Sequence, residues 1–330
     1  MSFGFLGLGG YVPPLVIDNA QVAEWAGTDE NWIVERTGIL ERRYREPGTA
    51  TSDLALHAAR EALAVLPDAE DRLGLIIVAT STPDQPQPST GAILQDKLGL
   101  SDIPAFDVNA VCSGFIYALA VADSMLTARL ARQGGEYALV VGTDVYSSLM
   151  DRTDRRTVSL FGDGAGAVLL GPVPEGYGVL GWRLVTHGEH RGLVEVPAGG
   201  TRTPLDAESR DAGGHLFRMQ GREVRDYALR TMPKVVGEAL DAAGIRLDEV
   251  DRFILHQANT RLVEACCREL GVDPDRVPLT APQFGNTAAA SIPLTLRAEH
   301  ERRPFQRGEL LVLAGVGGGM SAGAVVVRWY

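Results

Sequence analysis

The amino-acid sequence predicts an α/β fold built from two similar halves. Short apolar segments typical of buried strands alternate with helical patterns along the chain. The same order of patterns then occurs a second time, which indicates an internal repeat. Hydrophobic residues make up 45% of the 330 residues and aromatic residues only 6%, so we expect a core built mainly from Ala, Val, Leu and Ile.

The expected strands are short apolar runs without a polar face, which is typical of strands covered on both sides. They are LGLIIVAT (73–80), YALVVGT (137–143), AGAVLLG (165–171), RFILH (252–256) and ELLVLAG (309–315). The uncharged stretch Leu310–Val327 is long enough to suggest a membrane span. Its glycine triplet, residues 317–319, instead favours two strands joined by a turn.

The expected helices carry apolar residues at i, i+3 and i+4 spacing. One pattern extends from Leu54 to Leu63, and another from Val224 to Leu240, with Gly244 as its C-cap. Pro233 lies inside the second pattern and should kink the helix or mark its start. Residues 116–121 are apolar all round, which is typical of a buried helix.

The repeat relates the helix and strand patterns of the two halves. The same interval of 177 residues separates Glu61 from Glu238 and Ile76 from Phe253. GAGAVLL (164–170) is then echoed by SAGAVVV (321–327), after an apolar strand in each half. We therefore expect two similar halves, residues 1–172 and 173–330, packed as one unit.

Charge and cysteine content exclude several classes of function. The net charge of −11 argues against general nucleic-acid binding and against a polybasic membrane-surface role. The first residues, MSFGFLGLGGYVPP, lack the basic region of a secretory signal. Three cysteines cannot form a disulfide framework. We expect a cytoplasmic protein with reduced thiols.

Cys112 is the strongest candidate nucleophile. It follows FDVNAV and precedes the apolar helix, so it should lie at the helix N-terminus beside Ser113 and Gly114. The free N–H groups and the dipole of a helix N-terminus favour a thiolate. Cys266 and Cys267 lie in an ordinary helical stretch, where buried thiols are the simpler interpretation.

His256 and Asn286 also stand at the boundaries of predicted elements. His256 ends the strand RFILH, and Asn286 lies in the loop PQFGNTAAASIP. The C-terminal ends of strands are where α/β sheets present catalytic groups. Together with Cys112 they suggest a nucleophile and two hydrogen-bond donors. His187 and His190 lack a metal-site spacing and fit a surface loop, so no metal site is expected.

Papain-like cysteine proteases use the same three residue types in the same order. The spacing from Cys112 to His256 falls in their usual range of about 130–150 residues. However, Cys112 lies far from the N-terminus and its CSGF context differs from the protease motif. A protease fold also does not account for the repeat, so the protease is a remote alternative.

Six motifs resemble those of one known family. They are TDENWIVERTGI (28–39), FDVNAVCSGF (106–115), FGDGAGA (161–167), LHQAN (255–259), FGNTAAASIP (284–293) and GVGGGMSAGA (315–324). With these motifs, over nearly its whole length, the chain resembles the β-ketoacyl-acyl-carrier-protein synthase III family of the thiolase superfamily and its relatives in polyketide priming. The resemblance implies the thiolase fold, a duplicated five-layered αβαβα architecture.

The resemblance also implies an acyltransferase that starts fatty-acid or polyketide chains. Cys112 would take an acyl group from acyl-CoA as a thioester, and His256 and Asn286 would donate hydrogen bonds to a malonyl thioester on an acyl carrier protein. These bonds would stabilise the enolate left when carbon dioxide departs, and the enolate would attack the acyl group on Cys112. The N–H groups of Cys112 and Gly318 would form an oxyanion hole. Acyl-CoA is a substrate, and no metal or redox cofactor is implied.

Further residues match the family's substrate-binding positions. The resemblance implies a CoA site at Thr28, Trp32, Arg36 and Arg155, with Asn259 lining the pantetheine tunnel. Trp32 and Arg155 would hold the adenine between an indole and a guanidinium. A homodimer is also implied.

Two departures from the family pattern affect substrate and partner. Gln87 stands where a residue, often Phe or Thr, usually reaches the partner subunit's acyl pocket, and its polarity speaks against simple acetyl or straight-chain priming. Carrier-docking lysines are not matched, and Arg225, Arg261 and Arg268 are the nearby basic residues. Acyl transfer to a hydroxyl or amine without carbon–carbon bond formation therefore stays an alternative, although Asn286 favours condensation.

Overall fold

Two β-sheets organise the computed structural model, which describes residues 2–330. The first sheet has the strand order β1-β7-β6-β4-β5 and the second has the order β11-β12-β13-β8. The first contains β1 (Ser2–Tyr11), β4 (Leu73–Ala79), β5 (Ala105–Val108), β6 (Tyr137–Val145) and β7 (Asp163–Val173). The second contains β8 (Gly178–Thr186), β11 (Arg252–Leu255), β12 (Leu310–Gly317) and β13 (Ser321–Arg328). All five strands expected from the sequence lie in these two sheets.

The two sheets repeat one pattern of pairing. In the first, β4 runs parallel to β6, and β6, β7 and β1 follow in antiparallel pairs. In the second, β11 runs parallel to β12, and β12, β13 and β8 follow in antiparallel pairs. The repeat predicted from the sequence is thus confirmed, with β5 as an addition to the first sheet.

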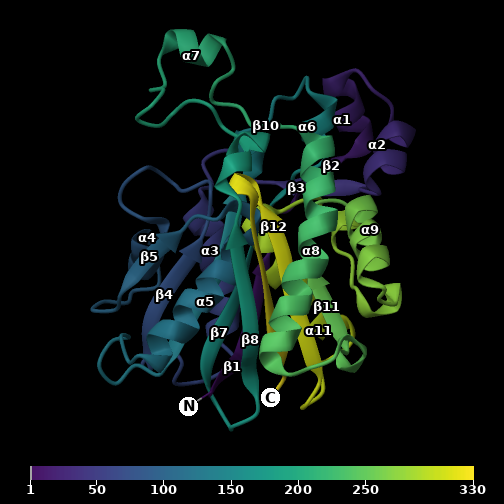
Figure 1. Ribbon diagram of the computed structural model, residues 1–330. Helices are drawn as coiled ribbons and strands as arrows, with labels where there is room; N and C mark the ends of the chain where they lie inside the picture. The colour runs from purple at the N-terminus through teal and green to yellow at the C-terminus, as the bar shows by residue number, and fades with distance from the viewer. Residues whose placement is uncertain (1) are drawn as a thin grey trace.

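Helices cover both sheets and fill the space between them, which gives five layers (Figure 1). The central layer holds α5 (Gly114–Thr127) and α11 (Ser291–Arg302). The outer layers hold α3 (Thr51–Leu63) and α4 (Thr90–Lys97) on the first sheet, and α8 (Gly221–Ala243) and α9 (Thr260–Leu270) on the second. Because apolar side chains surround α5 on both faces, it forms the buried helix that its sequence predicts.

Helix α8 begins earlier than its apolar pattern indicates. It starts at Gly221 and continues through Pro233, so the proline does not mark its start. Its end agrees with the prediction, because Gly244 adopts the left-handed conformation (φ 66°) that a C-cap glycine favours.

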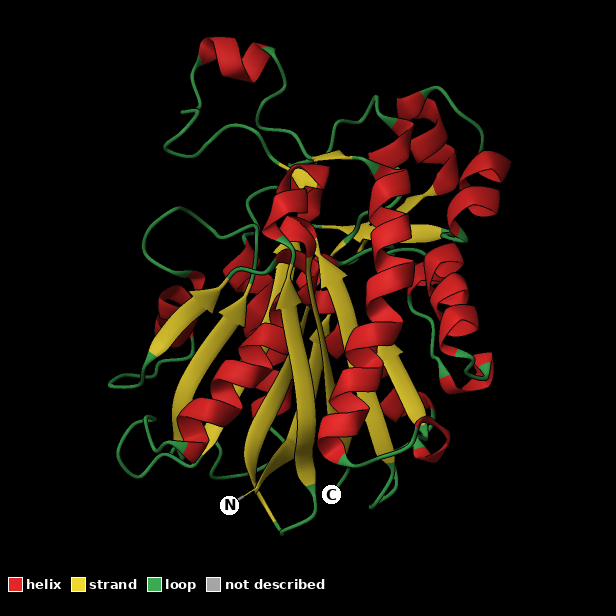
Figure 2. Ribbon diagram, in the orientation of Figure 1, coloured by secondary structure: helices red, strands yellow, loops and turns green. Residues whose placement is uncertain are grey.

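The remaining elements lie mainly at the end of the sheets where α8 begins (Figure 2). They are β2 (Leu15–Asp18), α1 (Asn19–Ala26), α2 (Glu30–Thr37), β3 (Glu41–Tyr44), α6 (Arg155–Val158), β9 (Val194–Glu195), α7 (Ala207–Asp211), β10 (Arg218–Met219) and α10 (Ala281–Phe284). This end of the molecule contains the catalytic candidates.

The glycine-rich segments are strands and turns. A Cβ atom at Gly9 would lie 2.0 Å from the carbonyl oxygen of Ala58 in α3, so glycine lets β1 press against that helix. The stretch from Leu310 forms β12 and β13 around the turn Gly318–Met320, as expected. No helix among residues 2–330 is both long and apolar enough to cross a membrane.

The strands of the first sheet lie within residues 2–173 and those of the second within 178–328. Helices α5 and α11 come from different halves but share one apolar cluster between the sheets. A division into units 1–172 and 173–330 stays a prediction, and these shared contacts are consistent with halves that pack as one unit.

Candidate active site

Cys112 lies in a tight turn directly before α5. The turn Val111–Ser113 is a short 3₁₀ helix, and Cys112 is buried, with 8% of its surface exposed. This is the position that the sequence predicts, between the strand β5 and a buried helix. The thiol lines a cavity of about 70 Å³.

The protonation of Cys112 differs from the prediction. Burial raises the pKa of the Cys112 thiol, and the negative charge of buried Asp144 raises it further. These effects oppose the helix N-terminus, which favours the thiolate. The Cys112 side chain is therefore a neutral thiol near pH 7, and a role as nucleophile would require a proton acceptor.

His256 follows the C-terminal end of β11. Its backbone N–H donates to the carbonyl oxygen of Ala314 at 2.8 Å, which holds the residue beside β12. Its Nδ1 lies 2.6 Å from the Ser291 hydroxyl oxygen at the start of α11. Burial lowers the pKa of His256 from 6.5 to about 4, so the imidazole is neutral near pH 7.

Asn286 is held by its loop so that its amide faces the cavity. The backbone N–H of Asn286 donates to the Leu160 carbonyl, and its carbonyl accepts from Gly162 N–H. Gly285 precedes it at φ 66°, where a Cβ atom would lie 2.6 Å from the Leu160 oxygen. The side-chain Oδ1 accepts from Ala288 N–H at 2.9 Å, which leaves Nδ2 as the donor for a ligand.

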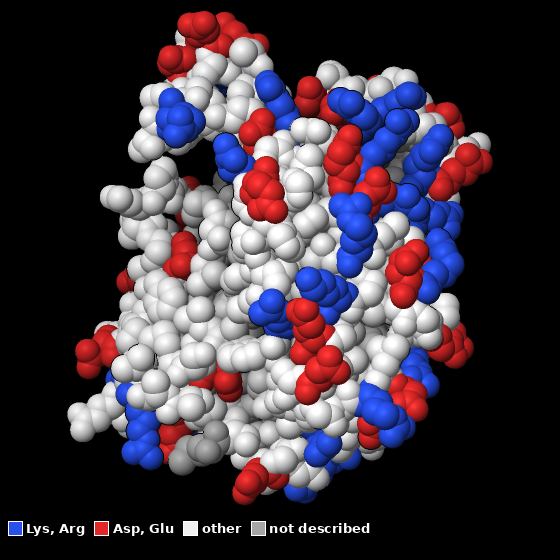
Figure 3. All heavy atoms as spheres, viewed as in Figure 1, with Lys and Arg blue, Asp and Glu red and all other residues white. Residues whose placement is uncertain are grey.

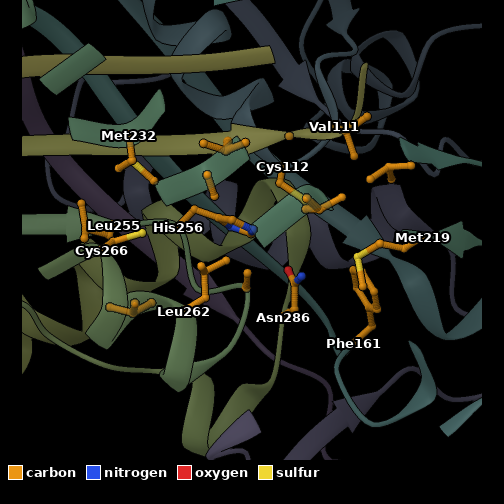
Figure 4. A pocket seen from close by; sticks show the side chains of 18 of the residues that line it. Val111, Cys112, Phe161, Met219, Met232, Leu255, His256, Leu262, Cys266 and Asn286 are labelled. Carbon is orange, nitrogen blue, oxygen red and sulfur yellow. The ribbon is translucent and has the colours of Figure 1, made fainter. Parts of the chain in front are cut away.

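The three predicted residues converge on one apolar cavity. Figure 4 shows the His256 ring and the Asn286 amide pointing into the same space as Cys112. Most of the remaining lining is aliphatic or aromatic, including Phe161 and Met219. Low polarity strengthens hydrogen bonds to a developing negative charge.

The glycine segment Gly317–Gly319 lies against Cys112 at one side of this cavity. Gly318 lines the cavity with Cys112. A Cβ atom at Gly317 would lie 2.9 Å from the backbone nitrogen of Cys112, so only glycine permits this approach. The two predicted oxyanion-hole residues are thus brought together.

A wider groove of about 520 Å³ leads from the surface toward the same site. It shares Met219, Leu262 and Asn286 with the inner cavity. Of the predicted CoA residues, Arg36 and Asn259 line this groove. Asn259 also caps α9, because its Oδ1 accepts from Leu262 N–H at 2.9 Å.

Trp32 and Arg155 are also brought together, although they come from α2 and α6. The Arg155 guanidinium carbon lies 4.7 Å from the centre of a Trp32 ring. This direct stacking leaves no space for a purine between them, so exposed Arg155 must rotate to admit one. Thr28 lies just before α2, and among the described residues its buried hydroxyl has no hydrogen-bond partner.

The predicted carrier-docking arginines lie at the groove, whereas Gln87 does not. Arg225, Arg261 and Arg268 all line the groove. Figure 3 shows Lys and Arg gathered over α2, α8 and α9, with acidic side chains among them. Gln87 is exposed and lines neither cavity of its own chain, so a role in an acyl pocket requires a second subunit.

Sequence reasoning missed two supporting side chains. The Ser291 hydroxyl contacts His256. Its position within the motif FGNTAAASIP was the sequence feature that could have identified it. Asp144 accepts hydrogen bonds from the backbone N–H groups of Ser81, Thr82 and Ala289, which ties strand ends around the site together. The sequence feature that could have identified Asp144 was a carboxylate directly after the buried run YALVVGT.

Within residues 2–330, no group of three or more His, Cys, Asp or Glu side chains is placed to hold a metal ion.

Comparison with known proteins identifies the family of the chain. Residues 106–188 match the family described as 3-oxoacyl-[acyl-carrier-protein (ACP)] synthase III, and residues 240–329 match its C-terminal part. The chain is 44% identical over 331 residues to the acetoacetyl CoA synthase of a Streptomyces species, covering 100% of this chain and 99% of that one. It is 40% identical over 329 residues to the β-ketoacyl-[acyl-carrier-protein] synthase III of Desulfitobacterium hafniense, covering 100% and 98%.

Solved structures give the same assignment. The 3-oxoacyl-(acyl carrier protein) synthase III of Pseudomonas aeruginosa superimposes with a TM-score of 0.90 at 36% identity, covering 100% of this chain and 98% of that one. A priming β-ketosynthase from a polyketide biosynthetic pathway gives 0.89 at 28% identity, covering 99% and 96%. From the fold and these relatives, the chain belongs to the β-ketoacyl-acyl-carrier-protein synthase III family.

Proposed function

We propose that this chain loads an acyl group from acyl-CoA onto Cys112 and condenses it with a malonyl thioester, with loss of carbon dioxide. Its family places it among acyl-transferring enzymes, which use acyl-CoA as a substrate and need no resident cofactor. The observation that carries the assignment of residues is the convergence of Cys112, neutral His256 and Asn286 on one apolar cavity.

In the first half-reaction, the Cys112 sulfur attacks the acyl-CoA carbonyl and its proton passes to Nε2 of His256. A neutral imidazole can accept this proton, and the pKa of His256, near 4, returns it readily to the departing CoA sulfur. The N–H groups of Cys112 and Gly318 stabilise the oxyanion of the tetrahedral intermediate. The products are free CoA and an acyl-Cys112 thioester.

In the second half-reaction, Nε2–H of His256 and Nδ2–H of Asn286 donate to the malonyl thioester carbonyl. The bond to the carboxylate breaks, carbon dioxide leaves, and the electron pair remains as an enolate. Its carbon attacks the acyl carbonyl, and Cys112 leaves as a thiolate that takes a proton from solvent. The Ser291 hydroxyl can support both half-reactions, because it accepts from Nδ1–H when Nε2 takes the thiol proton and donates to Nδ1 when the ring proton is on Nε2. The imidazole exchanges its proton with solvent between the two steps.

The lowered pKa of His256 predicts the pH dependence of decarboxylation. An imidazole with a pKa of about 4 stays largely neutral at pH 5, whereas an ordinary histidine is mostly protonated there. We expect the rate of carbon dioxide release from malonyl thioester at pH 5 to stay within about twofold of the rate at pH 7. A loss of about tenfold or more, centred near pH 6.5, would contradict a neutral buried His256.

Trp32 should bind the nucleotide end of CoA. Stacking of a base on an aromatic ring contributes about 1–3 kcal/mol, so Trp32→Ala should raise KM for acyl-CoA about tenfold and change kcat little. Acyl-pantetheine lacks the adenine, and its KM should not change. Trp25→Ala is a matched control, because Arg152 lies over Trp25 at 4.4 Å in the same way. An equal rise in KM for acyl-pantetheine, or for Trp25→Ala, would show that Trp32 does not act on the adenine.

We propose that the groove arginines receive the carrier of the malonyl group. Arg36, Arg225, Arg261 and Arg268 line the groove with Glu35 and Glu264. Arg261 is already engaged by Glu264 at 3.3 Å and by the Glu35 carbonyl. Arg36 belongs to the predicted CoA site, and the guanidinium of Arg225 lies 4.0 Å from the exposed Asp226 carboxylate. Arg225 and Arg268 are therefore the residues to vary, and they suit either an acidic carrier protein or the phosphates of CoA.

The proposed function is tested by supplying acetyl-CoA with malonyl-acyl carrier protein or malonyl-CoA. The name of the Streptomyces relative supports acetyl as the first acyl group to use. We expect a 3-oxoacyl thioester and carbon dioxide in equal amounts. Loss of the reaction with the protein carrier alone in Arg225→Ala and Arg268→Ala would support protein docking. If no acyl-CoA of any chain length gives a 3-oxoacyl product with either carrier, the proposed condensation is wrong.

The two alternative functions have less support from the site and the family. Acyl transfer to a hydroxyl or amine needs no enolate, and the orientation of Asn286 toward the cavity favours condensation. The five-layered fold and family membership exclude a papain-like protease.

We also propose that the chain acts as a homodimer in the cytoplasm. Strand β5 is at the edge of its sheet and its residues are half-buried, which fits pairing with a second copy. Light scattering in solution should give twice the mass of the chain.

A further inference from the structure

The turn Gly318–Met320 is held by two hydrogen bonds to the carbonyl oxygen of Met320. Tyr227 of α8 donates its hydroxyl proton to the Met320 carbonyl oxygen at 2.6 Å, and the backbone N–H of His187 donates to the same oxygen at 3.0 Å. The Tyr227 oxygen also lies 2.7 Å from His187 Nδ1. Because the single hydroxyl proton is directed to Met320, the Tyr227 oxygen accepts from Nδ1–H.

This turn has a conformation that requires support. Met320 lies at φ 54° and Gly319 at φ 72°, in the left-handed region that a non-glycine residue adopts only when its surroundings hold it there. At the other end of the turn, Gly317 packs against the backbone nitrogen of Cys112. A shift of the Met320 carbonyl would therefore move the Gly318 N–H relative to the nucleophile.

The environment of Tyr227 keeps this donor in place. Its side chain is 4% exposed, and burial raises the pKa of its hydroxyl, which stays protonated. The contact of α8 with its sheet is made by apolar residues such as Val235, Val236 and Ala239. The Tyr227 hydroxyl therefore adds little to the packing of α8, and its main contact is the hydrogen bond to the Met320 carbonyl oxygen.

We propose that Tyr227, supported by His187, is a positioning residue for the oxyanion hole, which fixes the Met320 carbonyl and so aims the Gly318 N–H at the thioester on Cys112. This rests on the proposed function, in which Gly318 serves tetrahedral intermediates whereas His256 and Asn286 serve the enolate. The two half-reactions therefore respond differently to the loss of Tyr227. Loss of a residue with a purely structural role would lower the rates of both half-reactions.

The test compares two rates in Tyr227→Phe, which removes one oxygen. We expect the rate of Cys112 acylation by acyl-CoA, followed by intact-protein mass, to fall about tenfold, since small misplacement of an oxyanion donor is costly. Carbon dioxide release from malonyl-CoA without acyl-CoA should stay within about twofold. Tyr137→Phe is the control, because it also removes one tyrosine oxygen, and Tyr137 begins β6 in the first sheet, away from the glycine turn of the second. Both of its rates should match the wild type.

Variants of His187 provide an independent check. His187→Ala leaves the Tyr227 hydroxyl without its donor and should lower acylation in the same direction. His187→Asn places an amide near the position of Nδ1 and should restore most of the rate. Equal losses in both half-reactions, no loss in either, or the same loss in Tyr137→Phe would overturn the positioning role. If the wild type shows neither half-reaction, the proposed function itself fails.

Discussion

Cys112→Ala will form no acyl-enzyme and will lose acyl transfer by about 10⁴-fold or more, because removal of a covalent nucleophile leaves only binding and hydrogen bonding. Intact-protein mass after incubation with acyl-CoA should show one acyl group on the wild type and none on the variant. Cys112 and Cys266 both line the cavity with His256 and Asn286, and Cys112 is the one whose backbone nitrogen lies against the glycine turn.

The other cysteines allow a matched control for this experiment. Cys267 is buried in α9 and lines neither the inner cavity nor the groove. Cys267→Ala should retain the full adduct. Persistence of the adduct in Cys112→Ala would mean that the nucleophile is another residue.

Asn286→Ala should decrease malonyl decarboxylation by about 10²–10³-fold, which corresponds to about 3–4 kcal/mol for one lost donor to an oxyanion. The donor is Nδ2, because Oδ1 is occupied by Ala288 N–H. Carbon dioxide release from malonyl thioester measures this step directly.

The acylation rate of the same variant serves as the control. Asn286 has no proposed role in the first half-reaction, so Cys112 should accept its acyl group at a rate close to that of the wild type. Loss of the hydrogen bond to Ala288 should cost about 1 kcal/mol of stability, which thermal unfolding would detect. A decrease in acylation as large as the decrease in decarboxylation would indicate a general disruption of the site.

The sequence alone predicted the parts of this molecule that depend on local patterns. Buried strands are apolar on both faces, so the runs at 73–80 and 137–143 identified β4 and β6 directly. Repetition of such patterns revealed the duplicated sheets. Cys112, His256 and Asn286 could be selected because each stands where a regular element begins or ends, and the structure brings all three to one cavity.

Properties that depend on tertiary environment were not predictable in this way. The position of Cys112 before a helix suggested a thiolate, but burial and Asp144 determine the direction of its pKa shift. Tyr227 and Met320 are 93 residues apart, and their hydrogen bond exists only because α8 packs on the second sheet. Gln87 is exposed and lines neither the inner cavity nor the groove, so its predicted place in a partner's acyl pocket stays a prediction.

The central claim is that an acyl group on Cys112 becomes part of a new carbon–carbon bond. A single-turnover experiment tests it most directly: acyl-enzyme is isolated free of CoA and mixed with malonyl-acyl carrier protein or malonyl-CoA. We predict that the adduct mass disappears while carbon dioxide and a 3-oxoacyl thioester appear in equal amounts. Transfer of the intact acyl group to a hydroxyl or amine acceptor, with no carbon dioxide released from either malonyl thioester, would contradict the account.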